Sequence, residues 1–236
     1  MSSSADALST ALSLVLGADP GLWAIVGLSL SVSLAAVTLA ALIGLPLGAL
    51  VALARFPGRG AVIVVLNAFM GLPPVVVGLV VYLSLSRAGP LGSWGLLFTP
   101  TAMVVAQTIL VLPIVAALAR QTVEGLWGEY GEQLRSLGVG TARAVPTLLW
   151  EGRFALATAC LAGFGRASAE VGAVMIVGGN IAGVTRTMTT AIALETSKGD
   201  LPLALALGIV LLAVIAGVNA VAAGVSAVGR RTAGVG

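Results

Sequence analysis

Apolar residues form long uninterrupted stretches in this sequence, and the charged residues fall mainly in the segments between them. Four stretches without a charged residue exceed the roughly 20 apolar residues that a helix needs to cross a bilayer. They are 20–54, 60–86, 88–119 and 201–229. A fifth stretch, 154–178, is apolar except for Arg166 and Glu170. The pattern predicts an all-α integral membrane protein with about five spans, near 24–54, 61–86, 98–119, 154–178 and 203–227.

The composition agrees with a bilayer as the solvent of this chain. Hydrophobic residues make up 58% and charged residues only 9%, whereas soluble domains carry about 25% charged residues. The sequence has no histidine and one cysteine, Cys160, which excludes a His/Cys metal site and a disulfide framework. The basic residues form no stripe, which argues against nucleic acid. No nucleotide-binding P-loop is present, so we expect no cofactor and no catalytic residue, and any ATPase has to be another chain.

The basic residues also predict an orientation, because cytoplasmic segments of membrane proteins are enriched in Lys and Arg. With the N-terminus outside and the C-terminus inside, the inner segments hold Arg55, Arg59, Arg120, Arg135, Arg143, Arg153, Arg230 and Arg231. The outer segments then hold only Arg87, Arg186 and Lys198. We therefore predict an outer or interfacial segment over 1–20, a transmembrane domain over 21–229, and an inner tail over 230–236, in a multi-pass protein of the plasma or inner membrane.

The longest predicted connection, 120–153, faces the cytoplasm in this orientation and holds four of the nine acidic residues. It is longer than the joining of two helices requires. A short helix is expected over Glu129–Leu137, ended by Gly138 in the left-handed conformation. Thr141 is expected to cap a second short helix that ends at Thr147. Such an element is either a rigid knob that a partner protein grips or an ordinary amphipathic connector, and the pattern favours neither.

One run in this connection resembles a known motif. Residues 132–138, Glu-Gln-Leu-Arg-Ser-Leu-Gly, resemble the Glu-Ala-Ala-x-x-x-Gly motif of ABC importer permeases, with Gln133 and Leu134 in place of its alanines. The resemblance implies that the two short helices dock on an ATPase subunit and transmit its closure. The residues expected to couple to the ATPase are Glu129, Glu132, Arg135, Leu137, Gly138 and Gly140.

Three further segments, 72–79, 165–181 and 185–195, resemble the oxyanion importer permeases, those for tungstate most closely and those for molybdate next. The resemblance implies a type I ABC importer permease fold and a homodimer that works by alternating access. Two cytoplasmic ATPase subunits and an extracytoplasmic oxyanion-binding protein are its implied partners. The alternatives are a molybdate or sulfate permease, a stand-alone secondary transporter or channel, and a membrane scaffold without substrate.

The two charges of the fifth stretch are the first candidates for an anion pathway. A lone charge inside a membrane costs about 2.5–3.5 kcal/mol or more. Arg166 and Glu170 lie four residues apart, so on a continuous helix they share one face and can pair. They form either a structural ion pair or the wall of a gate, where Arg166 attracts a dianion and Glu170 weakens that attraction.

The remaining pathway candidates also have two interpretations each. Pro73 and Pro74 are expected to break the second span, either beside a water-filled pathway or as a packing kink. Arg186 and Thr187 either contact a hydrated oxyanion or belong to a solvated loop whose threonines cap the next helix. Asn180 either lines the vestibule or ends the fourth span.

Three further positions are expected to shape the packing of the spans. Pro113 is expected to kink the third span. Gly44 and Gly48 are expected to let two helices pack closely.

Overall fold

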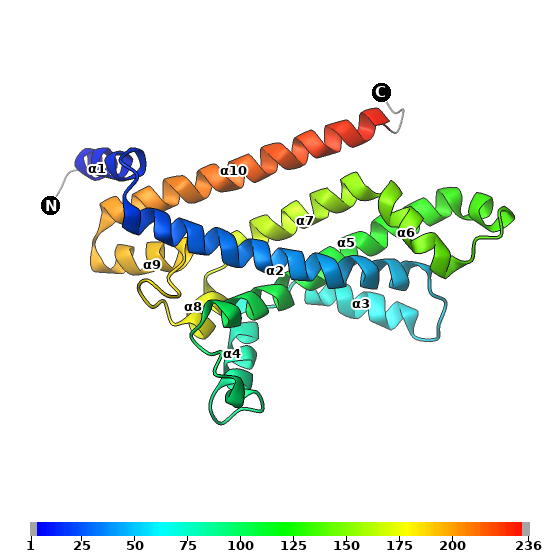
Figure 1. Ribbon diagram of the computed structural model, residues 1–236, viewed down its shortest axis with the longest axis horizontal. Coiled ribbons are helices and arrows are strands. Elements are labelled where there is room, and N and C mark those ends of the chain that lie inside the picture. The colour runs from blue at the N-terminus through cyan, green and yellow to red at the C-terminus, as the bar shows by residue number, and fades with distance from the viewer. Residues whose placement is uncertain (1–3, 233–236) are drawn as a thin grey trace. The chain divides into compact units, whose positions relative to one another are not determined.

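The computed structural model describes residues 4–232, and the side chains of 6–229. Every regular element in that part of the chain is a helix (Figure 1). In chain order these are α1 (Ser4–Leu16), α2 (Pro20–Leu53), α3 (Arg59–Phe69), α4 (Pro74–Leu85), the short 3₁₀ helix η1 (Gly92–Trp94), α5 (Pro100–Ser136), α6 (Thr141–Glu151), α7 (Arg153–Ser168), α8 (Gly172–Gly178), α9 (Met188–Lys198) and α10 (Leu201–Thr232).

Three uninterrupted helices, α2, α5 and α10, are long and apolar enough to cross a membrane. Two bent pairs, α3 with α4 and α7 with α8, pass the same test when each pair is taken as one span, which gives up to five spans. The all-α membrane fold predicted from hydropathy is therefore confirmed. The expected break at Pro73 and Pro74 is also present, since Pro73 precedes the first residue of α4 and Pro74 is that residue.

Several predicted boundaries were wrong. Helix α5 runs without interruption through Pro113 to Ser136, so Glu129–Leu137 is its last part and not a separate short helix. The charged residues from Arg120 on interrupt the apolar pattern of α5, so the pattern alone indicates a loop after the span. Thr141 is the first residue of α6 and does not cap it; Gly140 occupies the cap position in an extended conformation. Helix α6 continues past Pro146 to Glu151.

The two ends of the chain are helical where the structure describes them. The segment predicted to lie outside or at the interface contains α1. The predicted tail from residue 230 is helical as far as Thr232, because α10 continues into it. The rest of that tail, 233–236, and the side chains of Arg230 and Arg231 lie outside the described residues.

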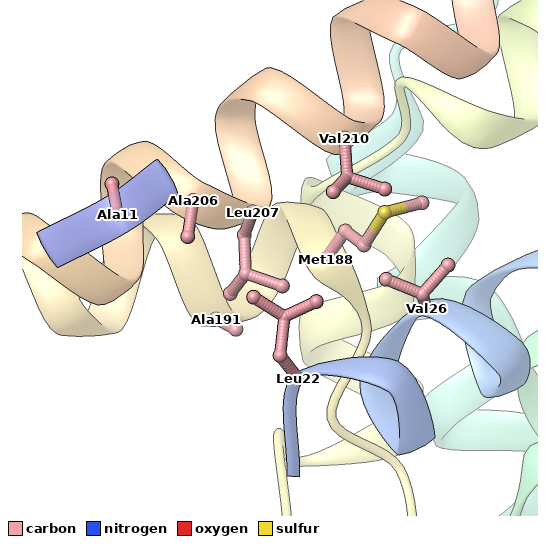
Figure 2. Packing of buried hydrophobic residues seen from close by; sticks show 8 residues of the cluster. All are labelled: Ala11, Leu22, Val26, Met188, Ala191, Ala206, Leu207 and Val210. Atoms are coloured by element: carbon pink, nitrogen blue, oxygen red, sulfur yellow. The ribbon is translucent and has the colours of Figure 1, made fainter. Parts of the chain in front are cut away.

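The chain divides into two compact units. The first unit contains the described residues up to Ala36 together with Pro73–Gln107 and Arg166–Gly217, and the second contains Val37–Leu72, Thr108–Gly165 and the residues from Val218 on. A buried apolar cluster in the first unit joins α1, α2, α9 and α10 (Figure 2). In the second unit, Ala49, Ala52 and Leu53 of α2 pack with Val123 of α5 and with Ala144 and Leu148 of α6.

Close helix contacts depend on glycine in both units. A Cβ atom at Gly48 of α2 would lie 2.3 Å from the carbonyl oxygen of Ala116 on α5. A Cβ atom at Gly44 would lie 3.2 Å from the side chain of Val115. The close packing predicted for these two glycines is confirmed. In the first unit, a Cβ atom at Gly78 of α4 would lie 2.8 Å from the Cα atom of Ala173 on α8.

Candidate functional site

The candidate residues fall into two groups, one in each unit. The first group is the α5–α6 element, which we define as residues 129–151. Gly138 ends α5 with φ +74°, as predicted from the sequence. The N–H of Gly138 donates to the carbonyl of Arg135 at 3.0 Å, and the N–H of Val139 donates to that of Leu134 at 2.9 Å. This pair of bonds is a Schellman motif, which satisfies the last carbonyls of a helix and turns the chain sharply.

The α5–α6 element has an apolar underside and an exposed tip. Leu148 is buried in the cluster shared with α2 and α5, and Leu134 packs against the same cluster. Leu137 at the tip is 77% exposed and Trp150 is 70% exposed. A groove of about 290 Å³ lies between the two helices, lined by Tyr130, Gln133, Leu134, Leu137, Thr147, Leu148 and Glu151. An exposed tip on a fixed apolar base can dock into a complementary surface without unfolding.

The predicted coupling residues are all exposed, but one of them is also held in place. Glu129 and Glu132 are exposed on α5, and so are Gly138 and Gly140 in the turn. Arg135 is held along its own helix, because its Nε donates to the carbonyl of Gly131 at 3.0 Å. Its guanidinium also lies 5.5 Å from the ring centre of Trp127. A cation placed in this way over an aromatic face is oriented before any partner arrives.

Sequence reasoning missed an ion-pair cluster at the base of the α5–α6 element. Arg59, the first residue of α3, contacts Glu124 on α5 at 2.9 Å, and Arg120 pairs with the same carboxylate. The four-residue spacing of Arg120 and Glu124 was a visible signal. The contact between Arg59 and Glu124 gave no signal in the sequence, because these residues are 65 positions apart.

The second group is the break junction, which we define as residues 73–75 and 166–173 of the first unit. Helix α4 begins at Pro74 and α8 begins at Gly172, and these two ends lie against each other (Figure 1). A Cβ atom at Gly172 would lie 2.9 Å from the side chain of Val75. The structure therefore brings together the break of the second predicted span and that of the fourth.

The charged pair predicted in the fourth span lies at the break junction. Arg166 Nη1 is 2.6 Å from Glu170 Oε2. The assumption of one continuous helix was wrong, because α7 ends at Ser168 and Glu170 lies in the turn before α8. From there Glu170 Oε1 accepts a hydrogen bond from the N–H of Ala173 at 3.2 Å. A carboxylate in this position satisfies an unpaired donor and is stabilised by the positive end of the helix.

The threonine-rich segment, residues 185–190, is held in place by hydrogen bonds of its own side chains. Thr187 and Thr190 form a capping box at the start of α9, and the side chain of Thr187 is buried. Thr189 Oγ1 donates to the carbonyl of Glu170 at 2.7 Å, which ties this segment to the break junction. Thr185 Oγ1 donates to the carbonyl of Gly178 at 2.6 Å. The hydrogen bonds match the helix-capping role expected here, but the threonines are buried and do not belong to a solvated loop.

Asn180 and Arg186 lie beside this segment. Asn180 follows the end of α8 with φ +51°, and its Nδ2 donates to the carbonyl of Thr190 at 3.3 Å. Arg186 Nη1 lies 3.7 Å from Glu195 Oε1, an oxygen that also accepts from Lys198 at 3.0 Å. Arg186 lines a mainly apolar cavity of about 380 Å³. A guanidinium with a carboxylate partner nearby is a weaker anion site than a free one.

A buried polar side chain also joins two helices of the first unit. Gln107 of α5 donates from Nε2 to the carbonyl of Ala167 at 3.0 Å. Gln107 Oε1 and Ser168 Oγ are buried and have no hydrogen-bond partner among the described residues. Polar side chains in spans commonly join helices in this way. Here the bond connects α5 to the end of α7, next to Arg166.

The sequence is similar to permeases of transport systems for anions. It is 46% identical over 205 residues to a probable anion ABC transporter permease protein of Haloferax volcanii, covering 84% of this chain and 88% of that protein. It is 41% identical over 217 residues to the tungstate uptake system permease protein TupB of Peptoclostridium acidaminophilum, covering 92% and 95%. TupB of Campylobacter jejuni is 43% identical over 148 residues, covering 63% and 62%.

More distant relatives are named for the transport of other oxyanions or of molybdenum. Permease proteins of molybdenum and sulfate transport systems are 28–31% identical to this chain. No protein-family model matches the sequence.

Proposed function

This chain belongs to the permease family of ABC transporters, and from that premise we propose that it is the permease subunit of an importer for tungstate or a similar tetrahedral oxyanion. The family makes it a multi-pass protein of the plasma or inner membrane. The observation that carries the proposed substrate is the 41% identity to a tungstate uptake permease over 92% of this chain. Molybdate and sulfate are the alternatives, because permeases named for those systems are also related, at 28–31% identity.

The proposed complex is a homodimer with the pathway on its two-fold axis. Two separate ATPase subunits bind on the cytoplasmic side, and an extracytoplasmic binding protein delivers the anion. The orientation needed is N-terminus outside and C-terminus inside, which the distribution of arginines supports. In that orientation the α5–α6 element faces the cytoplasm, where ATP is available.

We assign coupling to the α5–α6 element. Its exposed tip at Leu137 and its exposed acidic residues Glu129 and Glu132 suit contact with an ATPase subunit. The turn at Gly138 and Gly140 sets the direction of α6, and Arg135 stiffens the end of α5. Closure of the ATPase subunits would move this element, and the spans attached to it would open toward the binding protein.

The anion pathway is assigned to the break junction and its neighbours. Broken helices are tolerated inside a membrane beside protein or a water-filled cavity, and Pro73 and Pro74 mark such a break. Arg166 supplies a positive charge there, and its pairing with Glu170 keeps the attraction weak. Weak binding suits a pathway, because a deep energy well slows release. Asn180, Arg186 and Thr187 would shape the approach of the anion to the break junction. Thr187 would act by holding the loop before α9 in place.

The test is purification of the chain with the products of neighbouring genes. We expect an ATPase to co-purify, and its activity to rise when the complex is reconstituted with the binding protein and tungstate. Parallel assays with molybdate and sulfate identify the preferred anion. The absence of any co-purifying ATPase would overturn the proposed function, whereas a preference for molybdate would overturn only the substrate.

A further inference from the structure

Three charged side chains of the second unit, Arg59, Arg120 and Glu124, form a cluster that we call the clamp. Glu124 uses both carboxylate oxygens, Oε1 for Arg59 and Oε2 for Arg120. Arg59 is the first residue of α3, whereas Arg120 and Glu124 lie on α5. A single carboxylate therefore bridges one guanidinium of its own helix and one of another helix.

Arg59 has a second set of partners on a third helix. Its Nε donates to the carbonyl of Val51 at 2.9 Å, and its Nη2 donates to the carbonyl of Ala52 at 3.0 Å. These carbonyls belong to the last turn of α2, where helical oxygens lack partners within the helix. Arg59, the first residue of α3, thus donates hydrogen bonds to the end of α2 and pairs with Glu124 of α5. Five donors in a fixed fork make arginine suited to such a task.

Apolar contacts join the same helices as the clamp. Val51, Leu66 and Ala116 pack together from α2, α3 and α5. Ala52 and Val123, also of α2 and α5, pack with Leu148 of the α5–α6 element. Apolar packing is non-directional, whereas charge-assisted hydrogen bonds are directional. We therefore expect the clamp to add directional bonds to helices that apolar packing holds together.

The position of the clamp along α5 suits the transmission of movement between the α5–α6 element and the other helices. Glu124 lies twelve residues before the end of α5 at Ser136, between the apolar part of that helix and the α5–α6 element. We propose that the clamp transmits movement of the α5–α6 element to the ends of α2 and α3, with Arg59 and Glu124 as positioning residues for coupling. This inference rests on the proposed function, since it needs an ATPase that moves the element.

The test uses the whole complex, reconstituted with its ATPase and binding protein. The variants are Arg59→Gln and Glu124→Gln, each alone and both together. Arg87→Gln is the matched control, because Arg87 is an exposed arginine between α4 and η1. The readouts are the ATPase subunits retained on purification, basal ATPase activity, its stimulation by loaded binding protein, and anion uptake.

We expect both single variants to keep their ATPase subunits and basal activity, since partly exposed ion pairs contribute little to stability. Stimulation and uptake should fall about 2- to 30-fold, the range in which residues along a coupling route act. The double variant should lose no more than the worse single variant, because the two residues serve one contact. The control should match the wild type.

Stimulation and uptake at the wild-type level in both single variants would overturn the inference. Failure of both variants to retain ATPase subunits would also overturn it, because the clamp would then serve assembly and not transmission. A wild-type complex without any ATPase is a different result, since it rejects the proposed function itself. The two failures are therefore distinguishable in one experiment.

Discussion

At the scale of single residues, Glu170 shows how one carboxylate can serve two helices. It accepts the N–H of Ala173 in the first turn of α8 and pairs with Arg166 at the end of α7, and only 4% of its surface is exposed. Removal of one partner from a buried pair costs about 3–5 kcal/mol, because the other charge is left unpaired. Arg166 is partly exposed, so a smaller penalty is expected here.

This argument predicts a non-additive response at the charged pair. Glu170→Gln keeps an acceptor for Ala173 but leaves the charge of Arg166 without its partner. We expect a loss of about 1–3 kcal/mol, measured as a lower thermal midpoint of the detergent-solubilised protein. The double variant Arg166→Gln with Glu170→Gln should regain part of that loss. A double variant as unstable as the sum of the two single variants would contradict the pairing.

Gly48 gives a second prediction at the residue scale. A Cβ atom there would lie 2.3 Å from a backbone oxygen of α5, which no side-chain movement can relieve. Gly48→Ala should therefore force α2 and α5 apart and cost about 1–3 kcal/mol. Gly27→Ala is the matched control, because Gly27 lies on the same helix with nothing within 4 Å of its added Cβ atom. Equal thermal midpoints for the two variants would contradict the close contact.

At the scale of elements, the turn between α5 and α6 depends on one residue. Proline fixes φ near −65° and has no N–H, whereas Gly138 has φ +74° and donates to the carbonyl of Arg135. Gly138→Pro should redirect α6 without affecting the spans. We expect normal membrane insertion with uptake reduced at least tenfold, measured beside Gly125→Ala, a control on α5 with open space around it. Normal uptake by the Gly138→Pro variant would argue against the coupling role.

The elements also show what a sequence can and cannot reveal. Bilayer thickness sets the length of a span, so hydropathy located the apolar segments of α2, α5 and α10. The end of α7 was invisible, because Arg166 and Glu170 have helical spacing and still pair across a turn. The length of α5 was also hidden, since its charged residues from Arg120 on interrupt the apolar pattern and resemble a polar loop. The contact between Arg59 and Glu124 depends on tertiary structure alone.

At the scale of the whole molecule, the proposed mechanism depends on which side of the membrane holds the α5–α6 element. Cysteine labelling in intact cells tests this directly. In a Cys160→Ser background, Ser93→Cys places a thiol on η1, and Ser136→Cys places one at the end of α5. Both positions are exposed. With the N-terminus outside, a membrane-impermeant maleimide should label position 93 at once and position 136 only after the membrane is permeabilised.

The expected pattern follows from the arginines, which favour the cytoplasmic side for the segments around Arg120, Arg135 and Arg143. Uptake by both cysteine variants serves as the control that they are assembled correctly. The reverse labelling pattern would do more than invert the topology. It would place the α5–α6 element outside the cell, where no ATP-driven subunit can reach it, and the assignment of coupling to Gly138 and to the clamp would fall with it.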